Sequence, residues 1–244
     1  DNIQRKYFRI TFNDHSPQDV AARYTFMDNI QNFRDVGGYK SKKGRQVRWG
    51  KLYRSGNIHN FSEQDSIRLI EAGIKTIIDL RTAHEVKEQP IYFPNTQIIH
   101  IPIPCGNKEE MNQRILENKV RKRDGTLFME DAYIRFIANN TEDLGDVFRI
   151  LLDKKNYPIL ISGELGKDRV GLFISLLFSM LDIPQESITQ EYMSSNRYID
   201  PSFMAKTVSA LSTDAQETMT VLLSVNESFL NIAYREIENR YGSF

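Results

Sequence analysis

The 244-residue sequence predicts an α/β domain with a mainly parallel central sheet and a helical C-terminal third. Three short runs rich in β-branched and other apolar residues, at 74–80, 98–103 and 158–161, are typical of buried strands. Amphipathic segments lie between and after these runs, and this alternation is typical of parallel sheets covered by helices on both faces. We therefore expect three layers, α/β/α.

The elements can be placed in chain order. Residues 7–12 alternate as a short strand, and we expect residues 1–25 to form an N-terminal extension before a main domain at 26–244. Gly37-Gly38 predicts a turn before extended chain at 46–54, and Trp49 is expected in the core. Ser62 with Asp65 resembles a capping box that opens a helix ended by Gly73. Further helices are expected at about 127–138, at 142–154 and several times between 185 and 240.

Composition excludes several classes of protein. Thirty-two basic and 32 acidic residues give a formal net charge of zero, which argues against nucleic-acid binding by bulk electrostatics. The best candidate for a membrane span, 170–181, offers only twelve uncharged positions before Asp182, fewer than the ~20 apolar residues that a span needs, so we expect a soluble chain. The chain begins at Asp1 without a leader, and we expect either a cytoplasmic protein or an exported one whose leader has been removed.

Cysteine and histidine content bears on metals. The single cysteine, Cys105, excludes an intrachain disulfide and a cysteine-based zinc cluster. The four histidines show no pair at ligand spacing, and we expect no metal and no cofactor.

The most informative segment is 158–173, which combines a buried strand, a tight loop with Gly163 and Gly166, and a long apolar helix. Such a unit directs unpaired backbone N–H groups and the helix dipole at one point. Lys167 and Arg169 add two cations in the same turn, so phosphate is the expected occupant. The alternative is a tight turn whose charges face solvent.

This segment resembles the phosphate loop of cysteine-dependent tyrosine and dual-specificity phosphatases. Residues 166–171, Gly-Lys-Asp-Arg-Val-Gly, are similar to the bacterial loop His-Cys-x-x-Gly-Lys-Asp-Arg-Thr-Gly. Four further segments resemble the same bacterial branch in the same order: 32–39, 52–56, 78–81 followed by Glu85, and 241–243. The resemblance covers about residue 30 to the last residue and implies the three-layer phosphatase fold.

The resemblance also implies a mechanism. In the family a cysteine thiolate attacks phosphorus, an arginine clamps two oxygens, an aspartate protonates the leaving group, and water hydrolyses the phosphocysteine. Arg169 matches the arginine, and Asp168 is the candidate general acid. Asp79 and Arg81 would edge the pocket. The implied phosphate-binding residues are Gly163, Glu164, Leu165, Gly166, Lys167, Asp168 and Arg169.

The sequence departs from the family pattern around the sulfur. Gly163 stands at the cysteine position, Ser162 replaces the preceding histidine, and Val170 replaces the hydroxyl residue after the arginine. Glycine has no side chain and attacks nothing. Three changes together fit natural loss of the nucleophile better than a single engineered substitution, so we expect catalytic impairment.

Other candidate residues have less specific signals. Cys105 follows the second strand run and could open on the face of the loop, but we expect an ordinary thiol; we expect His84 at the surface. Arg34, Asp35 and Arg54 predict an ion-pair network around the loop. The basic run 119–123 is at the lower limit for binding anionic lipid, and a solvated helix end is the expected role.

Three functions remain open. The first is an impaired phosphatase relative that binds a phosphorylated protein, a phosphoinositide or another phosphate ester. The second is an active phosphatase, which requires another nucleophile or an engineered Gly163. The third is an interaction protein with a vestigial loop. None needs nucleic acid or a membrane span, and we rank them in this order.

Overall fold

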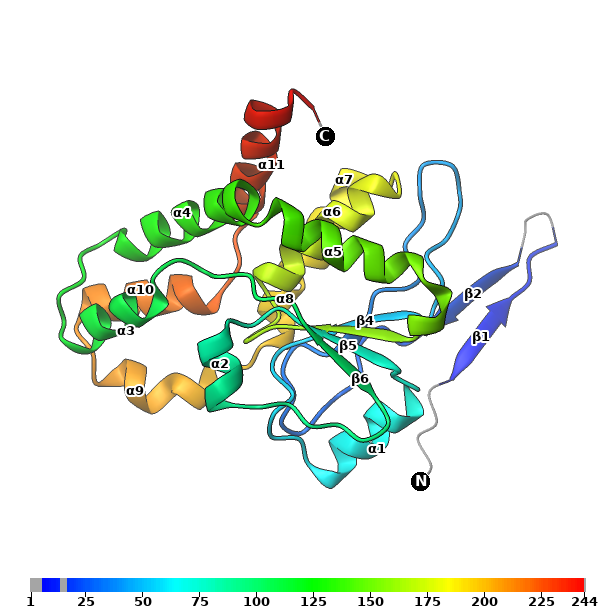
Figure 1. The fold of residues 1–244 in the computed structure, drawn as a ribbon, viewed down its shortest axis with the longest axis horizontal. Coiled ribbons are helices and arrows are strands. Elements are labelled where there is room, and N and C mark those ends of the chain that lie inside the picture. Colours follow the sequence, from blue (N-terminus) through cyan, green and yellow to red (C-terminus); the bar gives the residue numbers. More distant parts are fainter. Residues whose placement is uncertain (1–5, 14–16, 244) are drawn as a thin grey trace.

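The computed structural model describes residues 6–13 and 17–243 and places a five-stranded sheet at the centre of the molecule (Figure 1). The strand order is β3-β4-β7-β5-β6, and only β3 runs antiparallel to its neighbour. The mainly parallel sheet is therefore confirmed. Its strands are β3 Arg34–Asp35, β4 Leu52–Ser55, β5 Thr76–Asp79, β6 Gln97–His100 and β7 Ile159–Ser162.

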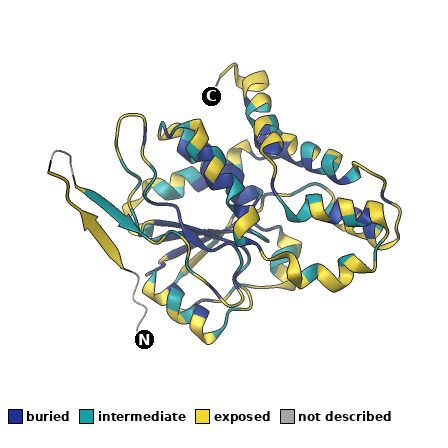
Figure 2. Cartoon of the chain, turned by 180° about the vertical axis from the view of Figure 1, so that it is seen from behind, coloured by how far each residue is buried: buried dark blue, intermediate teal, exposed yellow. Residues whose placement is uncertain are grey.

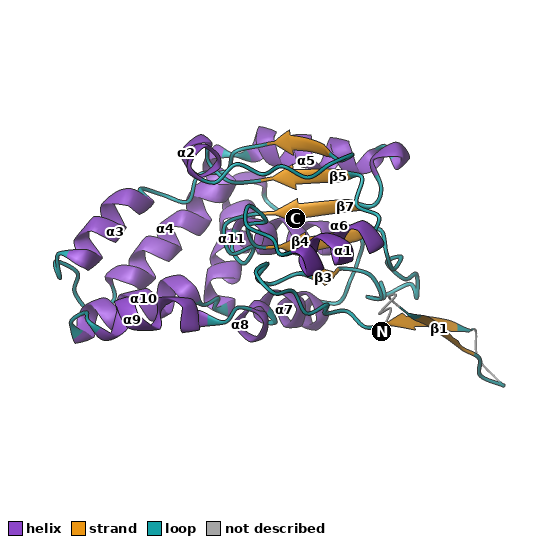
Figure 3. Cartoon of the chain, turned by 90° about the horizontal axis from the view of Figure 1, so that it is seen from below, coloured by secondary structure: helices purple, strands orange, loops and turns teal. Residues whose placement is uncertain are grey.

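Helices cover both faces of this sheet, as the alternation of strand residues requires. Ile77 and Leu160 belong to a cluster shared with Leu69 of α1, whereas Ile78 and Ile161 belong to the larger core on the other face. Figures 1 and 3 show helices on both sides of the sheet. The three-layer prediction is confirmed. The helices are α1 Glu63–Glu71, α2 Ala83–Glu88, α3 Lys108–Leu116, α4 Asp124–Asn139, α5 Thr141–Leu152, α6 Arg169–Met180, α7 Gln185–Met193, α8 Ser195–Tyr198, α9 Ala205–Ser209, α10 Thr213–Leu223 and α11 Glu227–Tyr241, with 3-10 turns η1 Lys154–Asn156 and η2 Pro201–Met204.

Local sequence signals explain several of these elements. Ser62 and Asp65 form the predicted capping box at the start of α1. Gly73 follows the end of α1 with a φ of 66°, a conformation that favours glycine. The helices expected at 127–138 and 142–154 are α4 and α5, and both begin earlier than predicted.

The N-terminal segment lies outside the central sheet. Strand β1 (Tyr7–Ile10) pairs antiparallel with β2 (Gln18–Ala21), and this hairpin is largely exposed (Figure 2). The expectation of a core tryptophan is wrong, because Trp49 is only half-buried and its indole N–H donates to the Asp19 carbonyl at 2.8 Å.

Helices α3, α9 and α10 form an arm beside the carboxyl end of the sheet (Figures 1 and 3). Its small separate core contains Met111 and Ile115 of α3 with Ala215 and Met219 of α10. The arm faces the loop between β7 and α6. No helix among residues 6–13 and 17–243 is long and apolar enough to cross a membrane.

Candidate phosphate-binding site

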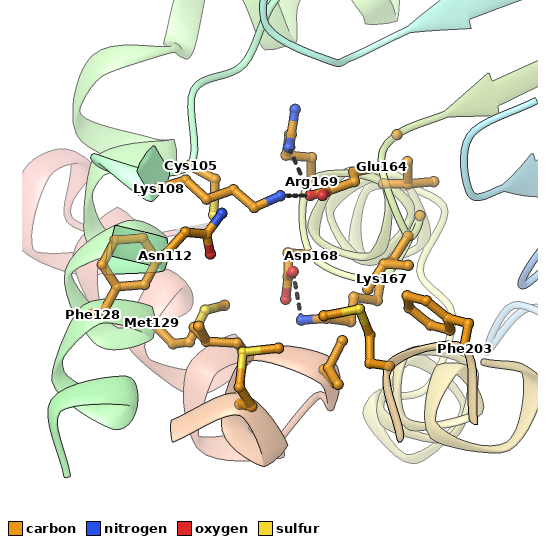
Figure 4. A pocket seen from close by; sticks show the side chains of 18 residues that line it. Cys105, Lys108, Asn112, Phe128, Met129, Glu164, Lys167, Asp168, Arg169 and Phe203 are labelled. Carbon is orange, nitrogen blue, oxygen red and sulfur yellow. Dashed lines mark hydrogen bonds and ion pairs between the residues drawn. The ribbon is translucent and has the colours of Figure 1, made fainter. Parts of the chain in front are cut away.

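The register of the parallel strands places the loop. Ser55, Asp79 and Ser162 are paired neighbours at the carboxyl ends of β4, β5 and β7. Ligands in parallel α/β sheets lie beyond this edge. The loop at 163–168 starts from the central strand of the three, and it opens into a pocket of about 180 Å³ (Figure 4).

The backbone of the loop is held from behind. The carbonyls of Glu164, Leu165 and Gly166 accept hydrogen bonds from the Asn57 N–H at 2.8 Å, the Asn32 side-chain amide at 3.0 Å and the Arg54 guanidinium, respectively. In a trans peptide the next N–H points opposite to the carbonyl. The N–H groups of residues 165–167 therefore point away from the scaffold, and within the described part of the chain none of them donates a hydrogen bond.

Gly166 allows the loop to approach β4 closely. Its φ is 64°, and a Cβ there would lie 2.0 Å from the Ser55 carbonyl oxygen. Only glycine fits this position. Two features therefore keep the loop amides turned toward the pocket: the backbone conformation at Gly166 and the three hydrogen bonds to the loop carbonyls.

Arg169, at the start of α6, is 6% exposed and presents one free edge to the pocket. Its Nη1 and Nη2 donate to the Glu85 carboxylate at 2.8 and 2.7 Å, and Nη1 also donates to the Leu80 carbonyl at 3.0 Å. The Nε–H and the second Nη2 hydrogen have no acceptor among the described residues. A guanidinium edge with two parallel donors matches the geometry of phosphate.

Glu85 fixes this arginine. Burial pushes the pKa of Glu85 up, but the hydrogen bonds and charge of Arg169 outweigh burial, and the pKa falls to about 2. The Thr82 N–H also donates to Glu85 in the capping box of α2. The glutamate that follows the 78–81 motif thus orients the arginine rather than the ligand.

Lys167 and Asp168 form a second fixed pair on the pocket wall (Figure 4). The Lys167 ammonium donates to Asp168 at 2.6 Å and to the Ser224 carbonyl at 3.1 Å. Tyr133 donates its single hydroxyl proton to Asp168 at 3.0 Å, so the Tyr192 hydroxyl, 2.6 Å from that of Tyr133, is the donor to Tyr133. Each carboxylate oxygen of Asp168 therefore has a donor.

The start of the loop is surrounded by small and apolar groups. Gly163 has no side chain, and a Cβ built there would lie 3.2 Å from Val170 Cγ2. The buried Ser162 hydroxyl donates to the Gly56 carbonyl at 2.9 Å, away from the loop amides. The methyl groups of Val170 thus crowd the space that a side chain at 163 would need.

Cys105 lines the same pocket, as the alternative sequence interpretation allowed. Burial, with a smaller contribution from the charge of Asp168, raises the pKa of the Cys105 thiol to about 11. The thiol is therefore protonated at neutral pH. Since the thiolate is the nucleophilic form of cysteine, this environment does not favour nucleophilic attack by Cys105.

The wall opposite the loop is mainly apolar. It comes from α4, η2 and α10, and Lys108 and Asn112 of α3 complete the rim (Figure 4). The apolar lining residues outside the loop are Phe128, Met129, Phe203, Met204, Met219, Leu222 and Leu223. The pocket therefore combines donors on one side with adaptable apolar contacts on the other.

The expectation that Asp79 and Arg81 edge the pocket is corrected by the structure. Arg81 Nε and Nη2 donate to the Asp79 carboxylate at 2.9 and 2.7 Å, and Nη1 donates to the Gln89 carbonyl at 2.8 Å. Both side chains are buried and neither lines the pocket. Because Asp79 and Arg81 are two residues apart at the end of β5, their side chains form an ion pair with each other.

The predicted ion-pair network around the loop is present, and it includes a residue the sequence did not indicate. Buried Glu191 of α7 accepts from Arg34 Nε and from Arg54 Nη1, both at 2.7 Å. Burial and the neighbouring Arg34 charge lower the pKa of Arg54 to about 10. The Asp35 carboxylate instead binds backbone: it accepts hydrogen bonds from the Gly37 and Gly50 N–H groups at 2.6 and 2.7 Å, which support a turn.

The remaining candidates lie at the surface, as expected. The His84 side chain is exposed, 3.7 Å from Glu88 and 3.9 Å from Glu109. The basic run 119–123 lies in the exposed segment before α4, with Val120 as its one buried residue, and Lys119 pairs with Glu117 at 2.7 Å. The described residues contain no cluster of metal-ligating side chains.

Comparison with known proteins finds relatives whose similarity covers most of the chain. A family model described as the tyrosine phosphatase family matches residues 25–244. A Cupriavidus necator protein provisionally named a tyrosine-protein phosphatase is 30% identical over 222 residues, covering 88% of this chain and 79% of the relative. Triple specificity protein phosphatase PtpB of Mycobacterium tuberculosis is 24% identical over 247 residues, covering 87% and 88%. The solved structure of P. aeruginosa TpbA with pTyr is 13% identical, covers 77% and 88%, and has a TM-score of 0.40.

Proposed function

The chain belongs to the tyrosine phosphatase family, and from that membership and the geometry of the loop we propose that it binds a phosphate monoester at residues 163–169 and is catalytically impaired. One observation carries this proposal. The donors that would hold phosphate are fixed and unoccupied by protein acceptors, whereas no ionised nucleophile faces them.

Binding follows from the donors. The amides of 165–167 and the free edge of Arg169 face one pocket, and the N-terminus of the twelve-residue helix α6 adds partial positive charge. A vestigial loop would be expected to turn its amides outward or to occupy them with protein carbonyls. The three carbonyl contacts behind the loop oppose that alternative.

Impairment follows from the missing nucleophile. Displacement at phosphorus by the family mechanism needs a thiolate in line with the leaving oxygen. Gly163 supplies no atom, the Ser162 hydroxyl is engaged elsewhere, and the Cys105 thiol stays protonated. A bound ester therefore meets binding groups without an attacking group.

The walls suggest the kind of ligand. The apolar side chains of α4 and α10 adjoin the donors, so an ester whose alcohol carries an aromatic or aliphatic group fits the pocket. The relative from M. tuberculosis is named a triple specificity protein phosphatase, which agrees with a phosphorylated protein as one ligand class. We propose a phosphorylated protein, a phosphoinositide or a similar ester as the partner.

Calorimetry with phenyl phosphate tests binding, and release of phenol from the same ester tests turnover. We expect saturable millimolar or tighter binding that Arg169→Lys weakens at least about tenfold, because lysine cannot bind two oxygens in parallel. Arg149→Lys is the matched control, since Arg149 is exposed and pairs only with Asp146 in its own helix. Absence of binding at millimolar ester overturns the proposed binding, and robust turnover by the unmodified chain overturns the proposed impairment; turnover that persists in Arg169→Lys would also place the reaction outside this loop.

A further inference from the structure

Glu164 is an unusual group beside an anion site. Its side chain lines the pocket and is 44% exposed (Figure 4). The carboxylate oxygen Oε2 contacts the Lys108 ammonium and lies 3.9 Å from Arg169 Nη2. The other oxygen, Oε1, has no hydrogen-bond donor within the described part of the chain. In contrast, both oxygens of Asp168 and both oxygens of Glu85 receive hydrogen bonds.

The charges around the loop balance. Lys108, Lys167 and Arg169 each lie beside a carboxylate, which is Glu164, Asp168 and Glu85 respectively. The pocket thus gains little attraction for a dianion from net charge. Its attraction for an anion comes from backbone amides and from one edge of Arg169, and these donors fit a monoanion as well as a dianion.

We infer that Glu164 makes this site selective for the protonated monoanion of a phosphate ester over a sulfate ester. This inference rests on the proposed function, because it describes the ligand of the same loop. Carboxylate oxygens only accept hydrogen bonds, so an anion beside Oε1 must bring a proton. A phosphate ester keeps one P–OH below its second pKa of about 6, whereas a sulfate ester has no such proton.

The position of Arg169 Nη2 brings the two groups together. The free hydrogen on Nη2 is one of the two donors that would hold the ester, and Glu164 Oε2 lies 3.9 Å from that nitrogen. An ester oxygen held there is a neighbour of the Glu164 carboxylate. A P–OH then donates to Glu164, and a fully ionised oxygen at the same place meets a like charge instead.

The direction of the pH dependence follows from the ligand. The groups facing Glu164 are Lys108 of α3, Arg169 of α6, Glu85 of α2, and Lys167 and Asp168 of the loop, with the Cys105 thiol on the wall. None is a histidine. Affinity for phenyl phosphate should therefore fall as the ester loses its last proton between pH 5 and pH 8, while affinity for phenyl sulfate stays constant.

The experiment measures both esters by calorimetry at pH 5 and pH 8. For the wild-type chain we expect phenyl phosphate to bind about five- to tenfold more tightly than phenyl sulfate at pH 5, with a smaller ratio at pH 8. In Glu164→Gln the phosphate-to-sulfate affinity ratio at pH 5 should be smaller, because the amide can donate a hydrogen bond to either ester. The ratio should then rise toward pH 8 instead of falling, because the neutral amide does not repel the phosphate dianion. Glu109→Gln, at an exposed glutamate of α3, should behave as wild type.

The outcomes separate the inference from the proposed function. Equal affinity for the two esters at pH 5, or a phosphate-to-sulfate ratio in wild type that rises toward pH 8, overturns the inference and leaves phosphate-ester binding intact. Failure of either ester to bind wild type or Glu164→Gln overturns the proposed function itself.

Discussion

The two halves of the 163–169 loop contrast in how they are held. In the second half, the Gly166 carbonyl, Lys167, Asp168 and Arg169 all have hydrogen-bond partners at buried or half-buried residues. In the first half, Gly163 has no side chain and Glu164 is half-exposed. The second half, which we call the binding half, is held through side chains as well as backbone, whereas the first half, which we call the reacting half, is held mainly through its backbone, at Gly163, Glu164 and Leu165. We therefore expect glycine at position 163 to be compatible with the anion-binding geometry.

The largest effect should come from removing the support behind the binding half. Glu191→Gln leaves Arg34 and Arg54 buried beside a neutral group, and breaking a buried ion pair costs about 3–5 kcal/mol. We expect the melting temperature to fall by roughly 10 °C or more. Asp131→Asn, which breaks an exposed ion pair with Arg135, should change it little. A melting temperature unchanged by Glu191→Gln would show that this network does not hold the loop.

Acid should loosen the binding half through Glu85. Its pKa of about 2 in the folded protein lies below its ordinary value of 4.5, so the stability it contributes is complete above about pH 4.5 and is lost as pH falls toward 2. This shift corresponds to on the order of 3 kcal/mol. Glu85→Gln should flatten the acid limb of a stability–pH curve between pH 5 and 2. Parallel acid limbs for the two proteins would contradict this assignment.

Within the binding half, Arg169→Lys isolates recognition from support. Lysine keeps a positive charge near Glu85 but offers no planar pair of donors, so phenyl phosphate affinity should fall about ten- to a hundredfold. The fall should exceed that produced by Arg149→Lys, a change at an exposed side chain of α5 that pairs with Asp146 of the same helix. Similar losses in both variants would mean that the ester binds elsewhere.

The smallest effect should come from restoring the reacting half. Gly163→Cys supplies a thiol that the loop amides and Arg169 can ionise, but its Cβ meets Val170 Cγ2 at 3.2 Å and no hydroxyl stabilises the sulfur. We expect slow phenol release and accumulated phosphocysteine. Adding Val170→Thr should raise the rate about ten- to a hundredfold, and then Ser162→His should raise it further. Full activity from Gly163→Cys alone would contradict the expected role of these neighbours.

Local patterns predicted much of the fold. The β-branched runs 74–80 and 158–161 and the Ser62–Asp65 cap each specify their element through neighbouring residues, and the structure contains all three. The loop was predictable for the same reason, because its glycines and cations lie within one turn of chain. Element ends were less predictable, since packing against the arm extends α4 to Asp124.

The partners of the loop were not predictable in the same way. Glu191 meets Arg54 across 137 positions, and Tyr133 meets Asp168 across 35, so no local spacing indicates either contact. For Asp79 and Arg81 the local sequence suggested a role, but it did not distinguish between two possible roles. Their position at a strand end suits both a ligand contact and a mutual ion pair, and only the folded geometry selects the ion pair.

One measurement tests the central claim most directly: phenyl phosphate titrated into the unmodified chain, with binding heat and phenol release followed in the same sample. We expect saturable binding at millimolar or lower concentrations of the ester, loss of most of that binding in Arg169→Lys, and negligible phenol release throughout. Robust phenol release by the unmodified chain would contradict this prediction, and release that persists in Arg169→Lys would place the reaction outside the loop at 163–169.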